Sequence, residues 1–188
     1  RAIKRMADGA LGSRSALLLE PYSDDAGNSG LRVDTLETIA GTGELALAHG
    51  YQLNTHAIGD RANREVLDLY AQLWRDTPQK QTQTLRWRIE HAQHLHPDDV
   101  PRFGRMGVIA AMQGVHATSD GPWVPKRLGE PRAGERTYVW RALWDSGAVA
   151  YWFKLARTKD GVDWIPHKID GEAGIGRHAR ERQRHAPM

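Results

Sequence analysis

Short apolar segments with strand character alternate with helical segments along most of this chain, and this alternation limits the folds that it can adopt. Strands are expected at 51–59, 84–92, 108–113 and 149–153. Helices are expected at 34–51, 60–76, 96–107 and 133–148. Strands that are separated by helices pair in parallel and carry the helices on the outside of the sheet. The chain is therefore expected to be an α/β protein with a parallel sheet.

Local signals indicate how two of the helices begin and end. Gly50 is expected to end the first helix, because glycine readily adopts the left-handed conformation that closes a helix. Asp60 stands at the start of the helix 60–76, where a short acidic side chain can accept hydrogen bonds from free backbone N–H groups. Asp60 is therefore expected to be a helix cap rather than a catalytic acid.

Histidines occupy equivalent places in two of the expected strands. His56 lies near the carboxyl end of the strand 51–59, and His91 near the carboxyl end of the strand 84–92. In parallel α/β folds, ligands collect at the carboxyl ends of the strands. One histidine at such a place is more often structural, but two imidazoles from neighbouring strand ends can hold the same divalent metal. The pair therefore predicts the first half of a metal site.

Three other histidines need a separate interpretation. His94 and His96 are two residues apart, and on a strand they would share a face and could chelate one metal. Because Pro97 and an acidic helix start follow at once, both are expected in a loop or above the helix entrance. His116 follows the expected strand 108–113, and the sequence is compatible both with substrate binding and with a loop role.

The positive charge of the chain is concentrated at one end. The isoelectric point is about 9.3 and the net charge is +3. Residues 154–188 hold eight Lys and Arg against five Asp and Glu, which accounts for the whole excess. A nucleic-acid-binding domain is expected to gather basic residues on a structured face. A nucleic-acid partner is therefore not the favoured interpretation.

Composition sets outer limits on the class of protein. A chain of 188 residues with 40% hydrophobic and 26% charged residues suits one globular domain with a core. The sequence contains no cysteine, so disulfides and thiolate metal sites are excluded and a reducing cytoplasm is the expected compartment. Neither a membrane-spanning run nor the apolar core of a secretory signal is found, so no membrane partner is expected.

Four ordered blocks of sequence resemble the amidohydrolase superfamily, and within it the amidohydrolase 3, or YtcJ-like, branch. The resemblance runs from about residue 3 to residue 147. The blocks are KRMADGALGSRSALLLEPYSDDAGNSG, THAIGDRANREVLDLY, RIEHAQHLHPDDVPRFGRMGVIAAMQ and HATSDGPWVPKRLG. Members of this family are (β/α)8 barrels of the TIM type that hold one or two divalent metals, often zinc, at the carboxyl ends of the strands.

The resemblance implies roles for individual residues. The histidine of THAIGD matches the family's metal ligand on the fifth strand, which assigns that role to His56. The histidine of IEHAQ matches the ligand on the sixth strand, which assigns it to His91. Lys4 corresponds to a fourth-strand lysine that is carbamylated and bridges two metals in many members, although an exposed lysine with no such role is equally compatible with its position.

The same resemblance implies a reaction. A divalent metal lowers the pKa of bound water and polarises a carbonyl group, which favours hydrolysis of an amide or related C–N bond in a small molecule. Each ligating imidazole requires an acceptor for its second ring nitrogen. The sequence identifies neither those acceptors nor the general base, so the catalytic residue stays unknown.

Two parts of the family pattern are not found in this chain. The His-x-His pair of the first strand and the Gly-Ser-Asp of the last strand have no counterpart. Residues 1–150 are therefore expected to form about half of a barrel, roughly strands four to seven, followed by an irregular, divergent and basic tail at 151–188. Such a chain is expected to pair with another copy or with a complementary barrel half.

Three functions follow from these observations. The first is a metal-dependent hydrolase of non-peptide C–N bonds, incomplete or inactive by itself. The second is a catalytically dead scaffold of the same ancestry that forms oligomers. The third is a nucleic-acid binder that uses the basic residues of 154–188.

Overall fold

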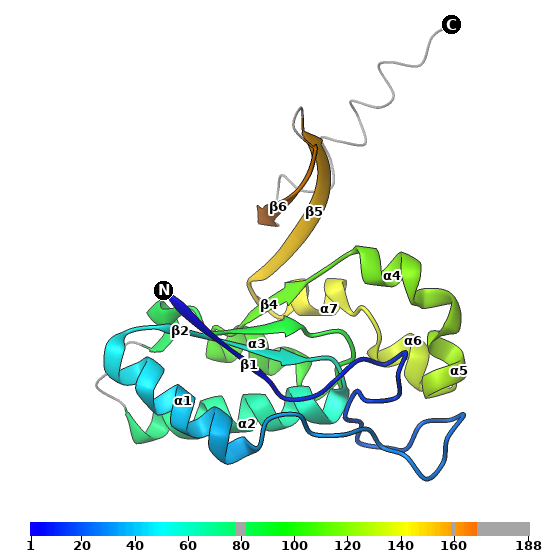
Figure 1. The fold of residues 1–188 in the computed structure, drawn as a ribbon, viewed down its shortest axis with the longest axis horizontal. Coiled ribbons are helices and arrows are strands. Elements are labelled where there is room, and N and C mark those ends of the chain that lie inside the picture. The colour runs from blue at the N-terminus through cyan, green and yellow to red at the C-terminus, as the bar shows by residue number, and fades with distance from the viewer. Residues whose placement is uncertain (78–81, 159–160, 169–188) are drawn as a thin grey trace, which may run out of the picture.

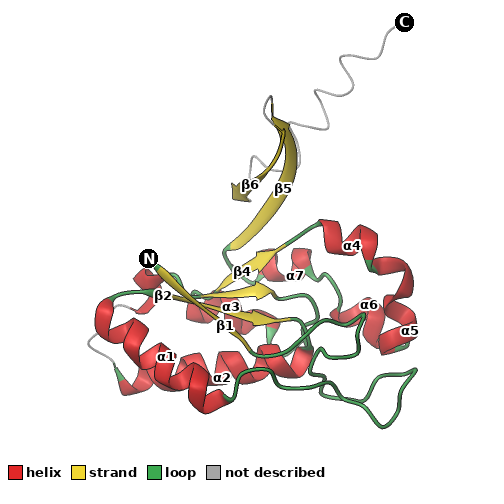
Figure 2. Cartoon of the chain, viewed as in Figure 1, coloured by secondary structure: helices red, strands yellow, loops and turns green. Residues whose placement is uncertain are grey.

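The computed structural model describes residues 1–77, 82–158 and 161–168. Within these residues the strands form one sheet, in which they lie side by side in chain order. Its strands are β1 (Ala2–Met6), β2 (Gln52–Ala57), β3 (Arg88–His91), β4 (Ile109–Met112), β5 (Ala150–Thr158) and β6 (Gly161–Lys168). The pairs from β1 to β5 are all parallel, and only β5 and β6 are antiparallel. The parallel α/β class expected from the sequence is confirmed (Figures 1 and 2).

Helices connect the parallel strands and cover one face of the sheet. Figure 1 shows the two longest helices together along one side of the strands. The outer helices are α1 (Leu36–His49), α2 (Asp60–Asp76), α3 (Val100–Met106) and α7 (Trp140–Asp145). Shorter elements are η1 (Thr82–Leu85), η2 (Gly121–Trp123), α4 (Val115–Ser119), α5 (Val124–Leu128) and α6 (Arg132–Arg136). In Figure 1, α4, α5 and α6 lie beyond the carboxyl ends of the strands.

The main hydrophobic core lies between the sheet and the outer helices. Leu53, Ile89 and Ala110, from three neighbouring strands, are completely buried. Trp87 is the largest buried side chain, and its indole N–H donates to Tyr51 O over 3.0 Å. Successive residues of a strand point to opposite faces, so the other face of the sheet carries polar side chains of β2 and β3, such as Asn54, His56 and Glu90, together with the apolar Ile109 and Ala111 of β4.

A second hydrophobic cluster holds the long connection between β1 and α1 in place. The cluster joins Leu18 and Tyr22 of this connection to Val124 and Leu128 of α5. Arg132 of α6 adds polar contacts, since its guanidinium donates to carbonyl oxygens of the same connection, Glu20 O and Pro21 O, at 3.1 and 2.8 Å. The connection is thereby packed against the carboxyl ends of the strands.

The ends of two helices allow a direct comparison with the sequence. Gly50 follows α1 in the left-handed conformation, with φ of 66°, as expected. The cap of α2, however, is Gly59, and Asp60 is the first residue of the helix. The expected cap position is therefore wrong by one residue. The Asp60 carboxylate accepts from Arg61 N–H of the first turn at 2.9 Å, and it also accepts from Leu19 N–H at 2.9 Å and from the Arg136 guanidinium at 2.8 Å.

The expected helix 133–148 is two helices in the structure, α6 and α7. Between them, Tyr138 has a left-handed backbone with φ of 51°. The interruption has a tertiary cause, because Thr137 forms an isolated antiparallel bridge with His94 and Tyr138 N–H donates to Gln93 O over 3.0 Å. The expected strand 84–92 is likewise shorter, since η1 and the left-handed Arg86 precede β3.

The expected strand 149–153 is present as β5, and the chain then turns back as β6. Residues 151–158 and 161–168 of the tail are therefore regular in their backbone, whereas residues 169–188 lie outside the described part of the chain. Among the described residues, no helix combines the length and apolar character that crossing a membrane requires.

Candidate metal centre

His56 and His91 meet at the carboxyl ends of neighbouring strands. His56 belongs to β2, and its strand register sets it beside Met6 and Glu90, on the sheet face opposite to the helices. Simple alternation along β3 would direct His91 to the other face. However, His91 and Ala92 both have left-handed backbones, with φ of 75° and 42°, which interrupts the alternation. The two imidazole rings lie with centroids 4.5 Å apart in an edge-to-face arrangement.

One ring nitrogen of each histidine is held by an acceptor. His91 Nδ1 lies 2.7 Å from Gln113 Oε1, and His56 Nε2 lies 3.3 Å from Gly9 O and 3.4 Å from Asp8 Oδ1. Oxygen atoms of these kinds accept, so both nitrogens carry hydrogen in the neutral rings. The lone pairs are therefore on His56 Nδ1 and His91 Nε2. A hydrogen-bonded second nitrogen is what a metal-binding histidine requires.

Burial keeps both imidazoles neutral. Burial, together with the nearby His56, lowers the pKa of His91 to about 3, whereas the hydrogen bond to Gln113 opposes the change. Burial also lowers the pKa of His56, against the opposing effect of the Gly9 carbonyl. Neutral imidazole is the form that binds a metal. The residues present therefore fit a divalent metal as a pair of nitrogen ligands.

Lys4 lies on the same face of the sheet as His56. Its register partner is Asn54, two residues before His56 in β2. The side chain is open to solvent, but surrounding atoms still partly desolvate the ammonium group, and this lowers the pKa of Lys4 against the opposing effect of Glu90. The positive charge of Lys4 contributes to the lowered pKa of both His56 and His91, so the structure places Lys4 near the pair.

His116 adjoins the pair from α4. Its ring centroid is 5.5 Å from that of His91, again edge to face. The Tyr138 hydroxyl ties this helix to a distant segment by donating to His116 O over 2.7 Å, and at the end of the helix itself Asp120 Oδ2 lies 3.8 Å from His116 Nδ1. His56, His91 and His116, which the sequence suggested as site residues, thus form one row at the carboxyl ends of β2, β3 and β4.

Asp8 and Gln113 are parts of this arrangement that sequence reasoning missed. Gln113 directly follows β4, so the strand-end argument that identified the histidines would also have identified it. Asp8 lies two residues after β1 and is completely buried. Burial raises the pKa of its carboxyl group to about 7, against the opposing effect of backbone N–H donors from Ile58, Gly59 and Leu17.

His94 and His96 lie outside the row, as expected. His94 is 1% exposed, with Nδ1 3.1 Å from Thr137 Oγ1 and no hydrogen-bond partner for Nε2 among the described residues. His96 Nδ1 accepts from Asp98 N–H over 3.3 Å just before α3. With these contacts, His94 and His96 do not share a face from which both could bind one metal.

Burial of His94 predicts that acid destabilises the fold. Burial lowers the pKa of His94 to about 3 from its usual value near 6.5. Below its usual pKa, His94 binds a proton in the unfolded chain but not in the folded chain. The contribution of His94 to the free energy of unfolding is therefore fully present above about pH 6.5 and is lost as the pH falls towards about 3. In urea titrations between pH 7 and 4.5, the wild type is expected to lose more stability than His94→Asn, which has no imidazole at this position. If the free energy of unfolding depended on pH equally in the wild type and in His94→Asn, this account would be contradicted.

The described residues contain no group of three or more His, Cys, Asp or Glu side chains arranged to hold a metal ion. The histidine pair offers two nitrogen donors, which is half of the four ligands that a tetrahedral metal requires.

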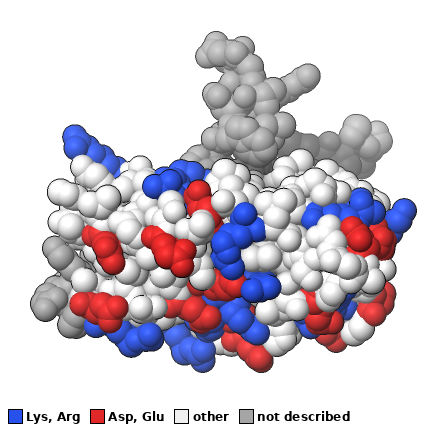
Figure 3. Space-filling view, turned by 60° about the horizontal axis from the view of Figure 1, so that its bottom comes forward, with Lys and Arg blue, Asp and Glu red and all other residues white. Residues whose placement is uncertain are grey.

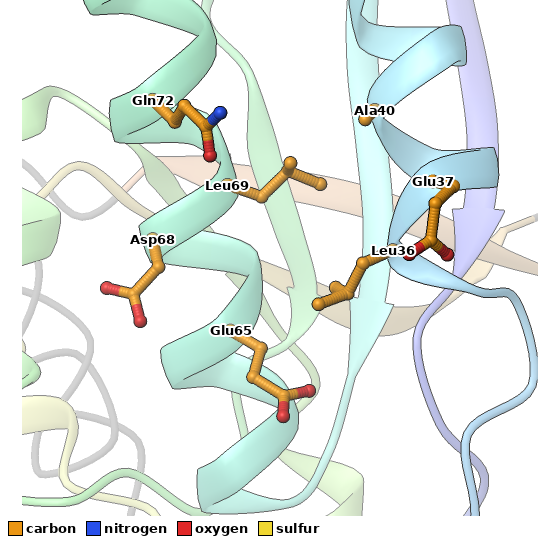
Figure 4. A pocket seen from close by; sticks show the side chains of 7 residues that line it. All are labelled: Leu36, Glu37, Ala40, Glu65, Asp68, Leu69 and Gln72. Atoms are coloured by element: carbon orange, nitrogen blue, oxygen red, sulfur yellow. The ribbon is translucent and has the colours of Figure 1, made fainter.

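A shallow groove elsewhere on the molecule does not belong to the site. It lies between α1 and α2, and Figure 4 shows Leu36 and Leu69 extending into it from the two helices. Two of its three acidic side chains, Glu65 and Asp68, pair with arginines, Arg32 and Arg102 among them. Because α1 and α2 cover the face of the sheet opposite to the histidines, the groove is remote from their chemistry.

Comparison with known proteins identifies relatives of most of the chain. A family model described as "Amidohydrolase family" matches residues 1–151. The protein LONG AFTER FAR-RED 3 of Arabidopsis thaliana is 38% identical over 147 residues, which are 78% of this chain and 25% of that protein. The protein named "Putative amidohydrolase YtcJ" of Bacillus subtilis (strain 168) is 36% identical over 148 residues, which are 79% of this chain and 27% of that protein.

A solved structure agrees with these relatives. The crystal structure of an uncharacterized metal-dependent hydrolase from Pyrococcus furiosus superposes with a TM-score of 0.68 and 31% identity, and covers 80% of this chain and 29% of that one. The chain thus spans about a quarter of the length of the curated relatives that it matches.

Proposed function

The chain belongs to the amidohydrolase family, and on that premise we propose that residues 1–150 form part of the metal centre of a hydrolase that cleaves non-peptide C–N bonds in small molecules. The observation that carries the proposal is the contact between His56 and His91, whose rings lie 4.5 Å apart with their second nitrogens held. Such a pair is prepared for a metal before the metal binds.

His56 and His91 are the proposed ligands, through Nδ1 and Nε2 respectively. When bound there, a divalent metal, which we propose to be zinc, supplies Lewis acidity towards a carbonyl oxygen and acidifies water. Gln113 holds the His91 ring so that Nε2 stays unprotonated. Their surroundings desolvate both rings in part, which disfavours the charged form and keeps both of them neutral.

Lys4 and His116 are the proposed neighbours of the reaction. The lowered pKa of Lys4 favours the uncharged amine, which is the form that carbamylation requires. His116 lies beside His91 with its ring partly exposed, which suits a contact with substrate. The remaining ligands and the general base are proposed to come from other strands of a complete barrel, in the same polypeptide or in a complementary partner.

Two other functions receive less support. On the face shown in Figure 3, Lys and Arg side chains are interspersed with Asp and Glu, which is not the basic patch of a nucleic-acid binder. A scaffold without catalysis would have no use for two neutral imidazoles with oriented second nitrogens. Small-molecule hydrolysis in the cytoplasm is the function that these residues favour.

A complementation assay tests the proposed function. The chain and zinc are incubated with N-acyl amino acids, ureas, formamides and cyclic amides, with and without a polypeptide that contains the remaining strands of the Bacillus subtilis relative. Hydrolysis is expected in the mixture, is lost in His56→Ala, and persists in His49→Ala, which changes an exposed histidine at the end of α1. The proposal fails if no mixture hydrolyses any of these compounds, or if activity survives His56→Ala.

A further inference from the structure

Asp8 is a completely buried carboxylate at which three segments of the chain converge. Its Oδ1 accepts from Ile58 N–H over 3.0 Å, and its Oδ2 accepts from Leu17 N–H and Gly59 N–H over 2.9 and 2.8 Å. Leu17 belongs to the connection after β1, whereas Ile58 and Gly59 link β2 to α2. One side chain therefore fixes the connection to the carboxyl end of the strand that carries His56.

The contacts of Asp8 exclude it from binding a metal directly. Both oxygens are occupied by backbone donors, and the side chain is 0% exposed, so no ion can approach it. The remaining polar neighbour is His56, whose Nε2 lies 3.4 Å from Oδ1. Any influence of Asp8 on the site must therefore pass through His56 and the residues that hold it.

The turn that contains Asp8 holds His56 at two further points. Ala7 N–H donates to His56 O over 2.9 Å, and Gly9 O lies 3.3 Å from His56 Nε2. Gly9 is itself fixed, since its N–H donates to Ser15 O over 3.1 Å. Residues 7–9 thus contact both the backbone and the ring of His56, and the hydrogen bonds of Asp8 hold these residues in place.

We propose that Asp8 is a positioning residue for His56. By anchoring residues 7–9, it directs Nε2–H of His56 towards the turn and leaves Nδ1 as the nitrogen available to a ligand. A carboxylate or carbonyl acceptor behind a ligating histidine fixes the tautomer and the orientation of the ring. The proposal rests on the proposed metal role of His56.

The test compares Asp8→Asn with Tyr22→Phe in the full chain. Asp8→Asn keeps the size of the side chain but turns one acceptor oxygen into a donor that faces backbone N–H groups. Tyr22→Phe removes a buried hydrogen bond of the same connection, from the Tyr22 hydroxyl to Ala16 O at 2.8 Å, without touching residues 7–9. Both variants are expected to lose stability.

Zinc affinity separates positioning from stability. Zinc binding is measured by calorimetric titration with zinc chloride. Only the binding that is lost in His56→Ala is counted as binding at the proposed site. This affinity is expected to fall by about 10- to 100-fold in Asp8→Asn, the usual effect of removing a residue that orients a metal-binding histidine. Tyr22→Phe is expected to leave it unchanged. An unchanged affinity in folded Asp8→Asn, or an equal loss in Tyr22→Phe, would overturn the proposal.

The tautomer of His56 provides a measurement that needs no folded variant of Asp8. In ¹⁵N spectra of the metal-free wild type, the His56 ring, assigned by its disappearance in His56→Ala, is expected to carry its hydrogen on Nε2. A hydrogen on Nδ1 would refute the positioning role even if Asp8→Asn does not fold. If the wild type shows no zinc binding that depends on His56, the proposed function fails, and the tautomer still tests whether the turn of residues 7–9 orients the ring.

Discussion

His56→Ala and His91→Ala are each expected to reduce the zinc bound by the purified chain to background. The wild type is expected to carry about one zinc per chain when size-exclusion chromatography is run in a buffer that contains zinc, because two imidazoles hold the same ion but leave two of its four positions open. Removal of either ring leaves a single nitrogen ligand, and the buried neutral partner cannot compensate for the loss. Elemental analysis of the eluted protein gives the ratio of metal to chain.

Two controls make this result interpretable. His49→Ala changes an exposed histidine in the last turn of α1 and is expected to keep the metal. His91→Gln keeps most of the side-chain volume, so metal loss in this variant reflects the missing imidazole rather than a cavity. Circular dichroism confirms that each variant is folded. Retention of zinc by either alanine variant would exclude the pair as the ligand set, and a folded wild type without zinc would leave only the architecture of a hydrolase.

Gly59→Ala is expected to destabilise the chain by about 3 kcal/mol or more, at the upper end of the usual cost of overpacking. A Cβ atom at Gly59 would lie 2.0 Å from Leu17 O and 2.7 Å from Leu17 N. These are backbone atoms and cannot turn aside as a flexible side chain can. The connection after β1 must therefore move away, and the hydrogen bonds of Asp8 to Leu17 and Gly59 must break.

Gly41→Ala is the matched control. Gly41 lies inside α1, and a Cβ atom there would meet no atom within 4 Å. The substitution is expected to raise stability by roughly 0.5–1 kcal/mol, because glycine is unfavourable inside a helix. Urea denaturation of the two variants should therefore shift in opposite directions. A Gly59→Ala variant as stable as the wild type would show that the close approach of Leu17 is not obligatory.

Features that depend on local sequence could be predicted. Gly50 ends α1 because glycine has no penalty in the left-handed conformation, and that rule applies before any tertiary contact forms. The apolar run of β4 identifies a buried parallel strand. The common position of His56 and His91 at strand ends follows from the parallel topology, so their proximity could be expected without coordinates.

Features that depend on distant partners could not be predicted. The break between α6 and α7 arises because Thr137 and Tyr138 bond to His94 and Gln93, more than forty residues earlier in the chain. The left-handed backbone at His91 could not be expected from its residue type, because only a few per cent of non-glycine residues adopt this conformation, although histidine is among the enriched types. The importance of Asp8 depends on backbone donors as far away as Gly59.

The register of the parallel strands also sets an order in which the chain can assemble. Pairing of β3 with β4 joins Arg88 to Ile109, whereas pairing of β1 with β2 joins Ala2 to Gln52, across more than twice as much chain. The longer closure costs about 0.8 kcal/mol more in chain entropy. Contacts of high sequence separation form slowly. His91 and Gln113 are therefore expected to come into contact early in folding. The contacts of residues 7–9 with His56 are expected to be among the last to form.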